Sequence, residues 1–69
     1  MDKLSKYARQ LIEGMLLIAK YDQYAGLSAE HDVIFFGTYE CRDEMIKDEQ
    51  KQMEDWGWHE EYDSWAIFV

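Results

Sequence analysis

A chain of 69 residues with one cysteine, Cys41, must fold without an internal disulfide. A domain of this size buries only about 60% of the surface of its unfolded chain, so it usually needs a staple or an unusually apolar core. No structural zinc site is readable, because Cys41, His31 and His59 lack the paired ligand spacing of such sites. Three Trp, five Tyr and three Phe can supply the core instead. We therefore expect a single domain, residues 1–69, with an aromatic core.

The expected compartment is the cytoplasm. A lone thiol suits a reducing environment. The longest apolar run, residues 15–19, is far shorter than the roughly 20 residues of a membrane span. The first residues, Met1-Asp2-Lys3, begin no signal peptide. We expect no membrane association.

A helix is predicted over residues 3–24, where apolar side chains recur at spacings of four and three: Leu4, Ala8, Leu11, Met15 and Ile18. Gly26, followed by apolar Leu27, favours a Schellman ending. Gly14 lies inside this helix at a cost of about 1 kcal/mol relative to alanine, which indicates close approach by another backbone.

The remaining chain predicts a strand, a second helix and a hairpin. Residues 33–36 are β-branched and aromatic and are expected to form a buried strand ended by Gly37. Residues 42–56 have helical spacing, with Thr38 or Asp43 as the cap and Gly57 as the stop. The apolar side of that helix is expected to carry Met45, Ile46, Met53 and Trp56. The hairpin is expected to have strands at 58–60 and 64–69 and a turn at 61–63.

These elements predict an α+β fold in the order α-β-α-β-β. A small, largely antiparallel sheet of three strands, with the C-terminal strand in the middle, packs against two helices. Trp56, Trp58 and Trp65 are expected in the core, with Trp58 the most exposed of the three. Tyr21, Tyr24, Tyr39 and Tyr62 lie near element ends, where they can serve as interface anchors.

Charge is distributed unevenly along the chain, whose net charge is −8. Residues 1–21 carry four cations and two carboxylates, whereas residues 22–69 carry three cations and thirteen carboxylates, a net charge of −10. Glu44, Asp48 and Asp55 are expected on one face of the second helix, in a row of roughly 16 Å. The candidate partner-binding residues are Glu40, Asp43, Glu44, Asp48, Glu49, Glu54, Asp55, Glu60, Glu61 and Asp63.

Two interpretations of these acids remain open. Rows of carboxylates can imitate backbone phosphates and so occupy a Lys/Arg-lined nucleic-acid cleft of another protein. Alternatively, they form a solvated face that keeps an aromatic-rich domain soluble. Direct binding to nucleic acid is disfavoured, because most of the surface would repel phosphate.

Enzymatic chemistry is not expected, and no cofactor or metal is implied. The neighbouring acids Glu40, Asp43 and Glu44 disfavour the thiolate that a catalytic Cys41 would need. His31 and His59 would form at most a weak metal site if the sheet brought them together; a local hydrogen bond is the simpler role.

The segments AEHDVIFFG (residues 29–37) and GWHEEYDSWAIFV (residues 57–69) resemble short proteins encoded by phages and prophages. The resemblance implies an accessory protein in the host bacterial cytoplasm, of the kind that includes acidic anti-CRISPR and DNA-mimic inhibitors of host defence complexes. It carries no functional residue across.

The leading prediction is thus a non-enzymatic inhibitor that blocks the basic nucleic-acid-binding cleft of a host protein. The alternative is a structural or adaptor module that acts through an apolar surface as a homodimer, by way of the first helix or an exposed sheet edge.

Overall fold

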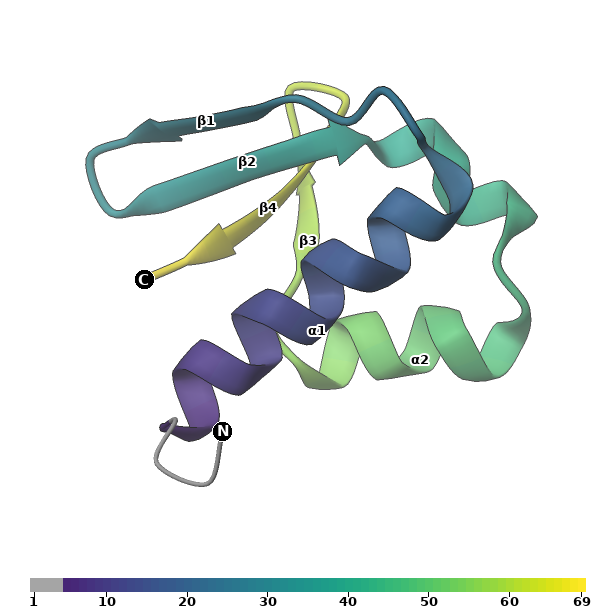
Figure 1. Ribbon diagram of the computed structural model, residues 1–69, viewed down its shortest axis with the longest axis horizontal. Helices are drawn as coiled ribbons and strands as arrows, with labels where there is room; N and C mark the ends of the chain where they lie inside the picture. Colours follow the sequence, from purple (N-terminus) through teal and green to yellow (C-terminus); the bar gives the residue numbers. More distant parts are fainter. Residues whose placement is uncertain (1–4) are drawn as a thin grey trace.

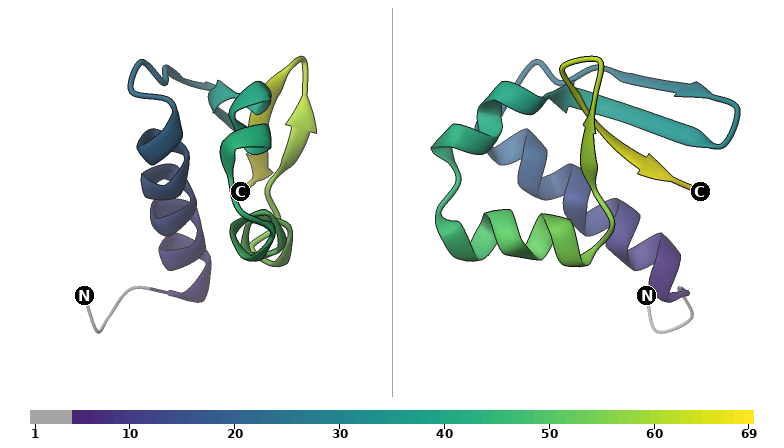
Figure 2. Two further views of the ribbon diagram at one scale, coloured as in Figure 1. Left: turned by 90° about the vertical axis from the view of Figure 1, so that its right-hand side faces the viewer. Right: turned by 180° about the vertical axis from the view of Figure 1, so that it is seen from behind.

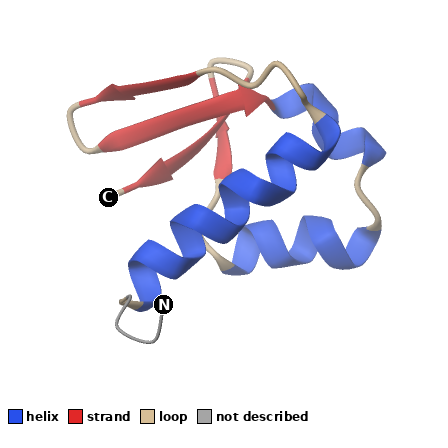
Figure 3. Cartoon of the chain, viewed as in Figure 1, coloured by secondary structure: helices blue, strands red, loops and turns tan. Residues whose placement is uncertain are grey.

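The computed structural model describes residues 5–69. Its elements in chain order are α1 (Lys6–Tyr21), β1 (Leu27–Glu30), β2 (Val33–Thr38), a 3-10 helix η1 (Tyr39–Glu44), α2 (Lys47–Asp55), β3 (His59–Glu61) and β4 (Ser64–Phe68). The strands form one antiparallel sheet in the order β1-β2-β4-β3 (Figures 1 and 3). The α+β class is confirmed, and the C-terminal strand is interior as predicted.

The sheet has four strands instead of the predicted three, because the prediction missed β1. All four residues of β1 are exposed, and its sequence LSAE has no β-branched or aromatic residue to mark it as a strand. Pairing of Glu30 with Val33 leaves only His31 and Asp32 in the β1–β2 turn, where His31 has a φ of 54°. A two-residue turn thus sets the register of this hairpin.

Strand β2 continues past the predicted end at Gly37. A register shift between Phe36 and Thr38 marks a bulge opposite β4. Gly37 has a φ of 70° there, and a Cβ atom would lie 2.6 Å from Ile18 Cγ2. Glycine satisfies both constraints. The side chains of residues 33–36 are half-buried, not fully buried as predicted.

Helix α1 begins at its Ser5 cap, whose Oγ accepts a hydrogen bond from Ala8 N at 3.1 Å. The predicted start at residue 3, with Leu4 in the stripe, lies outside the described residues. The helix ends at Tyr21 instead of residue 24, because the chain turns at Asp22, whose Oδ1 accepts from Tyr24 N. The predicted Schellman ending at Gly26 is therefore wrong.

The second predicted helix, residues 42–56, is two helices. It breaks at Met45 and Ile46, both of which are extended, with ψ values of 144° and 162°. Gln50 Nε2 donates to the carbonyls of Arg42 and Met45 at 3.0 and 3.1 Å, so the carbonyl groups at the break keep partners. Ile46, predicted on the apolar side, is 61% exposed.

The predicted caps of this helix are also corrected. Ile46 is the N-cap residue of α2, and its N–H donates to the Glu49 carboxylate at 3.1 Å. Thr38 precedes η1 and makes no side-chain cap hydrogen bond, and Asp43 lies inside η1. An acidic residue in the first turn compensates for a cap without a polar side chain.

The predicted stop at Gly57 is confirmed, and here the Schellman geometry is found. Gly57 has a φ of 92°. Its N–H donates to Glu54 O and the N–H of Trp58 donates to Met53 O, both at 3.0 Å. Met53 and Trp58 both belong to the core, which supplies the apolar contact typical of this ending.

The β3–β4 turn is one residue shorter than predicted. Glu61 pairs with Ser64, so only Tyr62 and Asp63 connect the strands. Both have positive φ values, 52° and 62°. This combination is characteristic of a type I′ hairpin turn, whose twist matches that of the strands.

The core lies between α1 and the face of the sheet that α1 covers. Ile18, Met53 and Trp65 are its largest fully buried side chains. Trp58 is 2% exposed, which contradicts the expectation that it would be the most exposed tryptophan. Its indole N–H donates to Gln10 O at 3.3 Å, and its ring lies against Gly14. The close approach at Gly14 is therefore made by a side chain, not by a backbone.

The layers are asymmetric. α1 lies on one side of the sheet, and no helix of residues 5–69 lies on the opposite side (Figure 2). Within the same range no helix is long and apolar enough to cross a membrane.

Candidate acidic binding surface

The ten predicted acidic residues divide into two groups. Eight are exposed to solvent; they are Glu40, Asp43 and Glu44 on η1, Asp48, Glu54 and Asp55 on α2, and Glu60 and Asp63 on the β3–β4 hairpin. The other two, Glu49 and Glu61, are half-buried and engaged within the molecule.

The predicted row of three carboxylates is not on one helix. Glu44 belongs to η1, whereas Asp48 and Asp55 belong to α2, beyond the break at Met45 and Ile46. Asp48 and Asp55 are seven residues apart and share one face of α2. The estimated length of 16 Å assumed a continuous helix and therefore does not apply.

The exposed face of α2 carries both signs of charge. Lys51 follows Asp48 by three residues and precedes Asp55 by four, so it shares their face. Lys47 and Lys51 are exposed, and neither forms an ion pair within residues 5–69. These two cations reduce the negative potential along α2 at distances below the Debye length of about 8–10 Å.

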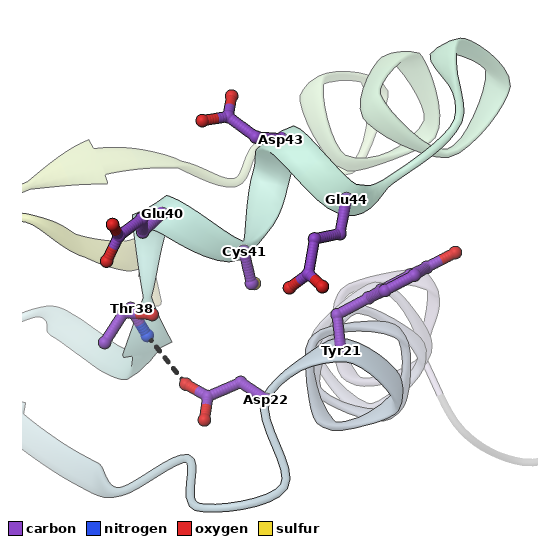
Figure 4. A pocket seen from close by; sticks show the side chains of 7 residues that line it. All are labelled: Tyr21, Asp22, Thr38, Glu40, Cys41, Asp43 and Glu44. Carbon is purple, nitrogen blue, oxygen red and sulfur yellow. Dashed lines mark hydrogen bonds between the residues drawn. The ribbon is translucent and has the colours of Figure 1, made fainter.

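The acids of η1 border a cleft of about 400 Å³ between η1 and the C-terminal end of α1. Tyr21, Asp22, Thr38, Glu40, Cys41, Asp43 and Glu44 line it (Figure 4). In Figure 4 the side chains of Cys41 and Glu44 point toward the space beside α1, whereas the carboxylate of Asp43 points away. The negative charge of the other lining acids, Asp22, Glu40 and Glu44, favours a cationic ligand.

Asp22 was not among the predicted site residues. Its Oδ2 accepts a hydrogen bond from Thr38 N at 3.0 Å, which ties the end of α1 to the start of η1. It was missed because it lies far from the acidic segments in sequence. Asp22 was itself assigned to the helix predicted over residues 3–24, so a turn at this position was not expected.

Cys41 lies on the buried side of the cleft, with 4% of its surface exposed. Burial raises the pKa of its thiol, a hydrogen bond from Trp65 lowers it, and the charges of Asp22 and Glu44 raise it further. Trp65 Nε1 lies 3.4 Å from Cys41 Sγ. This environment disfavours the thiolate, but the main cause is burial, and of the three acids named from the sequence Glu44 contributes.

Glu49 links α2 to α1. Its carboxylate accepts a hydrogen bond from Tyr21 Oη, and its Oε2 lies 3.1 Å from Lys20 Nζ. The pKa of Glu49 is lowered, mainly by the hydrogen bond from Tyr21. The pKa values of Tyr21 and Lys20 are both raised, chiefly because each forms a hydrogen bond with Glu49. Glu49 therefore joins the two helices, which leaves it less available to a partner.

The two histidines do not meet. His59 Nε2 lies 2.9 Å from Glu61 Oε2 on β3, while His31 lies in the β1–β2 turn, and β1 and β3 are at opposite edges of the sheet. Within residues 5–69 no three His, Cys, Asp or Glu side chains are grouped as a metal ion would require.

A second hollow, about 600 Å³ in volume, is mostly apolar. It lies between the first turns of α1, the end of α2 and the end of β4, and its apolar walls include Tyr7, Leu11, Trp56, Ile67 and Val69. Tyr7 and Val69 are 77% and 64% exposed. Exposed apolar side chains around a hollow are typical of interaction sites.

Comparison of the chain with protein-family models, with curated proteins and with solved structures finds no match. The resemblance of residues 29–37 and 57–69 to phage-encoded proteins therefore stays a prediction. Any function has to be inferred from the chain's own surface.

Proposed function

We propose that this chain is a non-enzymatic binding protein that uses its acidic surface to block a basic, nucleic-acid-binding cleft of another protein. The observation that carries the proposal is the cleft between α1 and η1, bordered by Asp22, Glu40, Asp43 and Glu44. Carboxylates held at such a concave site attract the Lys and Arg side chains with which nucleic-acid-binding proteins contact phosphates.

The lack of internal neutralisation supports this proposal. Within residues 5–69 only two ion pairs form, Lys20–Glu49 and His59–Glu61. Residues 22–41 contain no Lys or Arg, and neither do residues 52–69. The negative potential of these regions is therefore directed outward, where it accelerates association with a basic partner.

The phage resemblance suggests where such a partner would be found, namely in a host defence complex in the bacterial cytoplasm. A non-catalytic role agrees with the environment of Cys41, whose thiol is buried and has a raised pKa. The acids of α2 contribute less than those of η1 in this proposal, because two cations, Lys47 and Lys51, lie among them, whereas η1 contains one, Arg42.

Two charge-reversal variants with the same net charge test the proposal. The first changes Glu40, Asp43 and Glu44 to Lys, and the second changes Asp48, Glu54 and Asp55 to Lys. Partners captured from a host lysate by the unmodified chain are tested for DNA or RNA binding, and each variant is then assayed as a competitor of that binding at two salt concentrations.

We expect the unmodified chain to displace nucleic acid and to lose potency steeply with salt. The η1 variant should lose far more potency than the α2 variant. Equal losses of potency in the two variants would show that only the net charge of the chain matters. Full potency of the η1 variant would refute the cleft as the binding surface.

A second candidate function is that of an adaptor module that forms a homodimer through an apolar surface. The apolar hollow beside Tyr7, Trp56 and Val69 favours it. Sedimentation at low and high salt separates the two candidates, because an apolar dimer persists at high salt whereas a charge-driven complex dissociates. A chain that is monomeric at both concentrations excludes the homodimer.

A further inference from the structure

The face of the sheet opposite α1 carries aromatic side chains where an exposed antiparallel sheet usually carries polar ones. The register places Phe35 and His59 on either side of Ala66 on this outer face. The ring of His59 stacks on that of Phe68, with centroids 4.9 Å apart. Ala66 is fully buried even though no helix covers this face, so the surrounding side chains cover it.

Tyr62 extends this surface at the hairpin turn. Its ring centroid lies 6.2 Å from that of Phe35, at an interplanar angle of 51°. Tyr62 is 86% exposed and Phe68 is 61% exposed, so both present ring surface to solvent. We call Phe35, His59, Tyr62 and Phe68 the aromatic platform.

Carboxylates flank the aromatic platform at both edges of the sheet. Glu30 on β1 pairs with Val33, which lies on the same face as Phe35, and Glu61 on β3 is on the same face as His59. The four strands contain no Lys or Arg at all. Within residues 5–69 the only cations placed over aromatic rings are Lys20 and Arg42, over Tyr21 and Tyr39, away from this face.

We propose that the aromatic platform is a docking site for arginine side chains of a basic protein segment. A guanidinium group is planar, is weakly hydrated and stacks on aromatic faces, while its N–H groups pair with a carboxylate in a bidentate manner. The exposed rings of Tyr62 and Phe68 offer the stacking contact, and Glu30, which forms no ion pair within residues 5–69, offers a carboxylate; Glu61 already lies 2.9 Å from His59 Nε2. The ammonium of lysine is more strongly hydrated and lacks the planar surface, so the site discriminates between the two cations.

Charge complementarity selects this occupant over the others. A second copy of the chain that met this face with its own sheet would bring further carboxylates and no Lys or Arg, because the four strands contain none. A nucleic acid would bring phosphates to Glu30 and Glu61. The inference rests on the proposed function only for the class of partner, a basic protein, and concerns a different surface from the cleft of η1.

The test compares amidated hexa-arginine and hexa-lysine peptides, which have the same net charge, by NMR titration of the full chain. We expect hexa-arginine to bind about two- to fivefold more tightly than hexa-lysine. The resonances of the Phe35 and Tyr62 rings should shift on binding. The variant Tyr62→Asn should bring the two affinities together, since asparagine tolerates the positive φ of the turn and removes only the ring.

Tyr24→Asn is the matched control, because Tyr24 is 87% exposed but lies outside the sheet. It should keep the preference for arginine. Equal affinities of the unmodified chain for the two peptides would overturn the proposal. Resonances of the Phe35 and Tyr62 rings that shift with protein concentration alone would also overturn it, because they would indicate self-association through this face. If the η1 charge-reversal variant keeps the arginine preference, the platform stands even where the proposed function fails.

Discussion

Replacing Gly14 by alanine tests the packing that holds α1 against the rest of the molecule. An added Cβ would lie 2.5 Å from Trp58 Cε2 and 2.8 Å from Cδ1, and closer still to Nε1. These atoms belong to the rigid indole ring of a side chain that is only 2% exposed. The ring can move away only by losing its hydrogen bond to Gln10 O and its contacts in the core.

Two opposing effects determine the sign of the change. Alanine is favoured over glycine inside a helix by about 1 kcal/mol. Overpacking of a well-packed core typically costs about 1–3 kcal/mol, and loss of the Trp58 hydrogen bond adds about 1 kcal/mol. We therefore expect Gly14→Ala to lower the free energy of unfolding by about 1–3 kcal/mol.

Urea denaturation followed by far-ultraviolet circular dichroism measures this change. With a slope of about 1 kcal/mol per M for a small domain, the midpoint should fall by about 1–3 M. Gly26→Ala is the control, because no atom lies within 4 Å of its added Cβ. That variant should be neutral or up to about 1 kcal/mol more stable.

A double-mutant cycle identifies the cause. Trp58→Phe removes the indole nitrogen, so Gly14→Ala should cost less in that background, with a coupling of about 0.5–3 kcal/mol. A Gly14→Ala protein as stable as the unmodified chain would refute the contact between Gly14 and Trp58, and with it the way in which α1 packs on the α2–β3 junction.

Two further predictions concern titratable groups. Because the pKa of Glu49 is lowered in the folded state, its contribution to stability is present above the ordinary glutamate pKa and is lost as the pH falls through the folded value. Urea midpoints should therefore decline between about pH 5 and pH 3, and less so in Glu49→Gln; parallel pH profiles would contradict this. Cys41, buried and with a raised pKa, should react with a thiol reagent much more slowly in the native protein than in urea. Rapid stoichiometric labelling of the native chain would show that Cys41 is accessible.

Local patterns were sufficient to predict the interiors of the elements. The apolar spacing of residues 8–18 predicted the body of α1, and Gly57 predicted the end of α2 with its positive φ. Residues 64–69 have mostly apolar side chains on both faces, which predicted an interior C-terminal strand; in the structure Trp65 and Ile67 face the core and Ala66 is buried on the other side. In each case the signal lies within one element.

The errors arose where a distant residue determines the local structure. The turn after α1 is held in place by Asp22, whose carboxylate accepts a hydrogen bond from Thr38 N on β2 as well as from Tyr24 N. β1 forms because it pairs with β2, and its own composition gives no sign of a strand. The position of Trp58 depends on the space left by Gly14 on another helix. None of these partners can be identified from spacing alone.

The candidate site, like the fold, was predictable from the sequence only in part. The acidic character of residues 22–69 is a property of composition and was predictable, but the choice between α2 and η1 was not. A continuous helix would have aligned Glu44 with Asp48 and Asp55, whereas the break at Ile46 separates them. The cleft also includes Asp22, which the chain brings to η1 only through the fold.

The aromatic platform bears on whether the acids only maintain solubility. That role requires charged side chains distributed over the surface and few exposed aromatic groups. On the outer face of the sheet, however, Phe68 is 61% exposed and Phe35 is half-buried, and no helix packs there. Tyr62 adds a third ring at the turn, in a backbone conformation that asparagine or glycine adopts more readily. Aromatic rings retained at exposed positions between carboxylates are better explained by a ligand that needs both, and a guanidinium group is such a ligand.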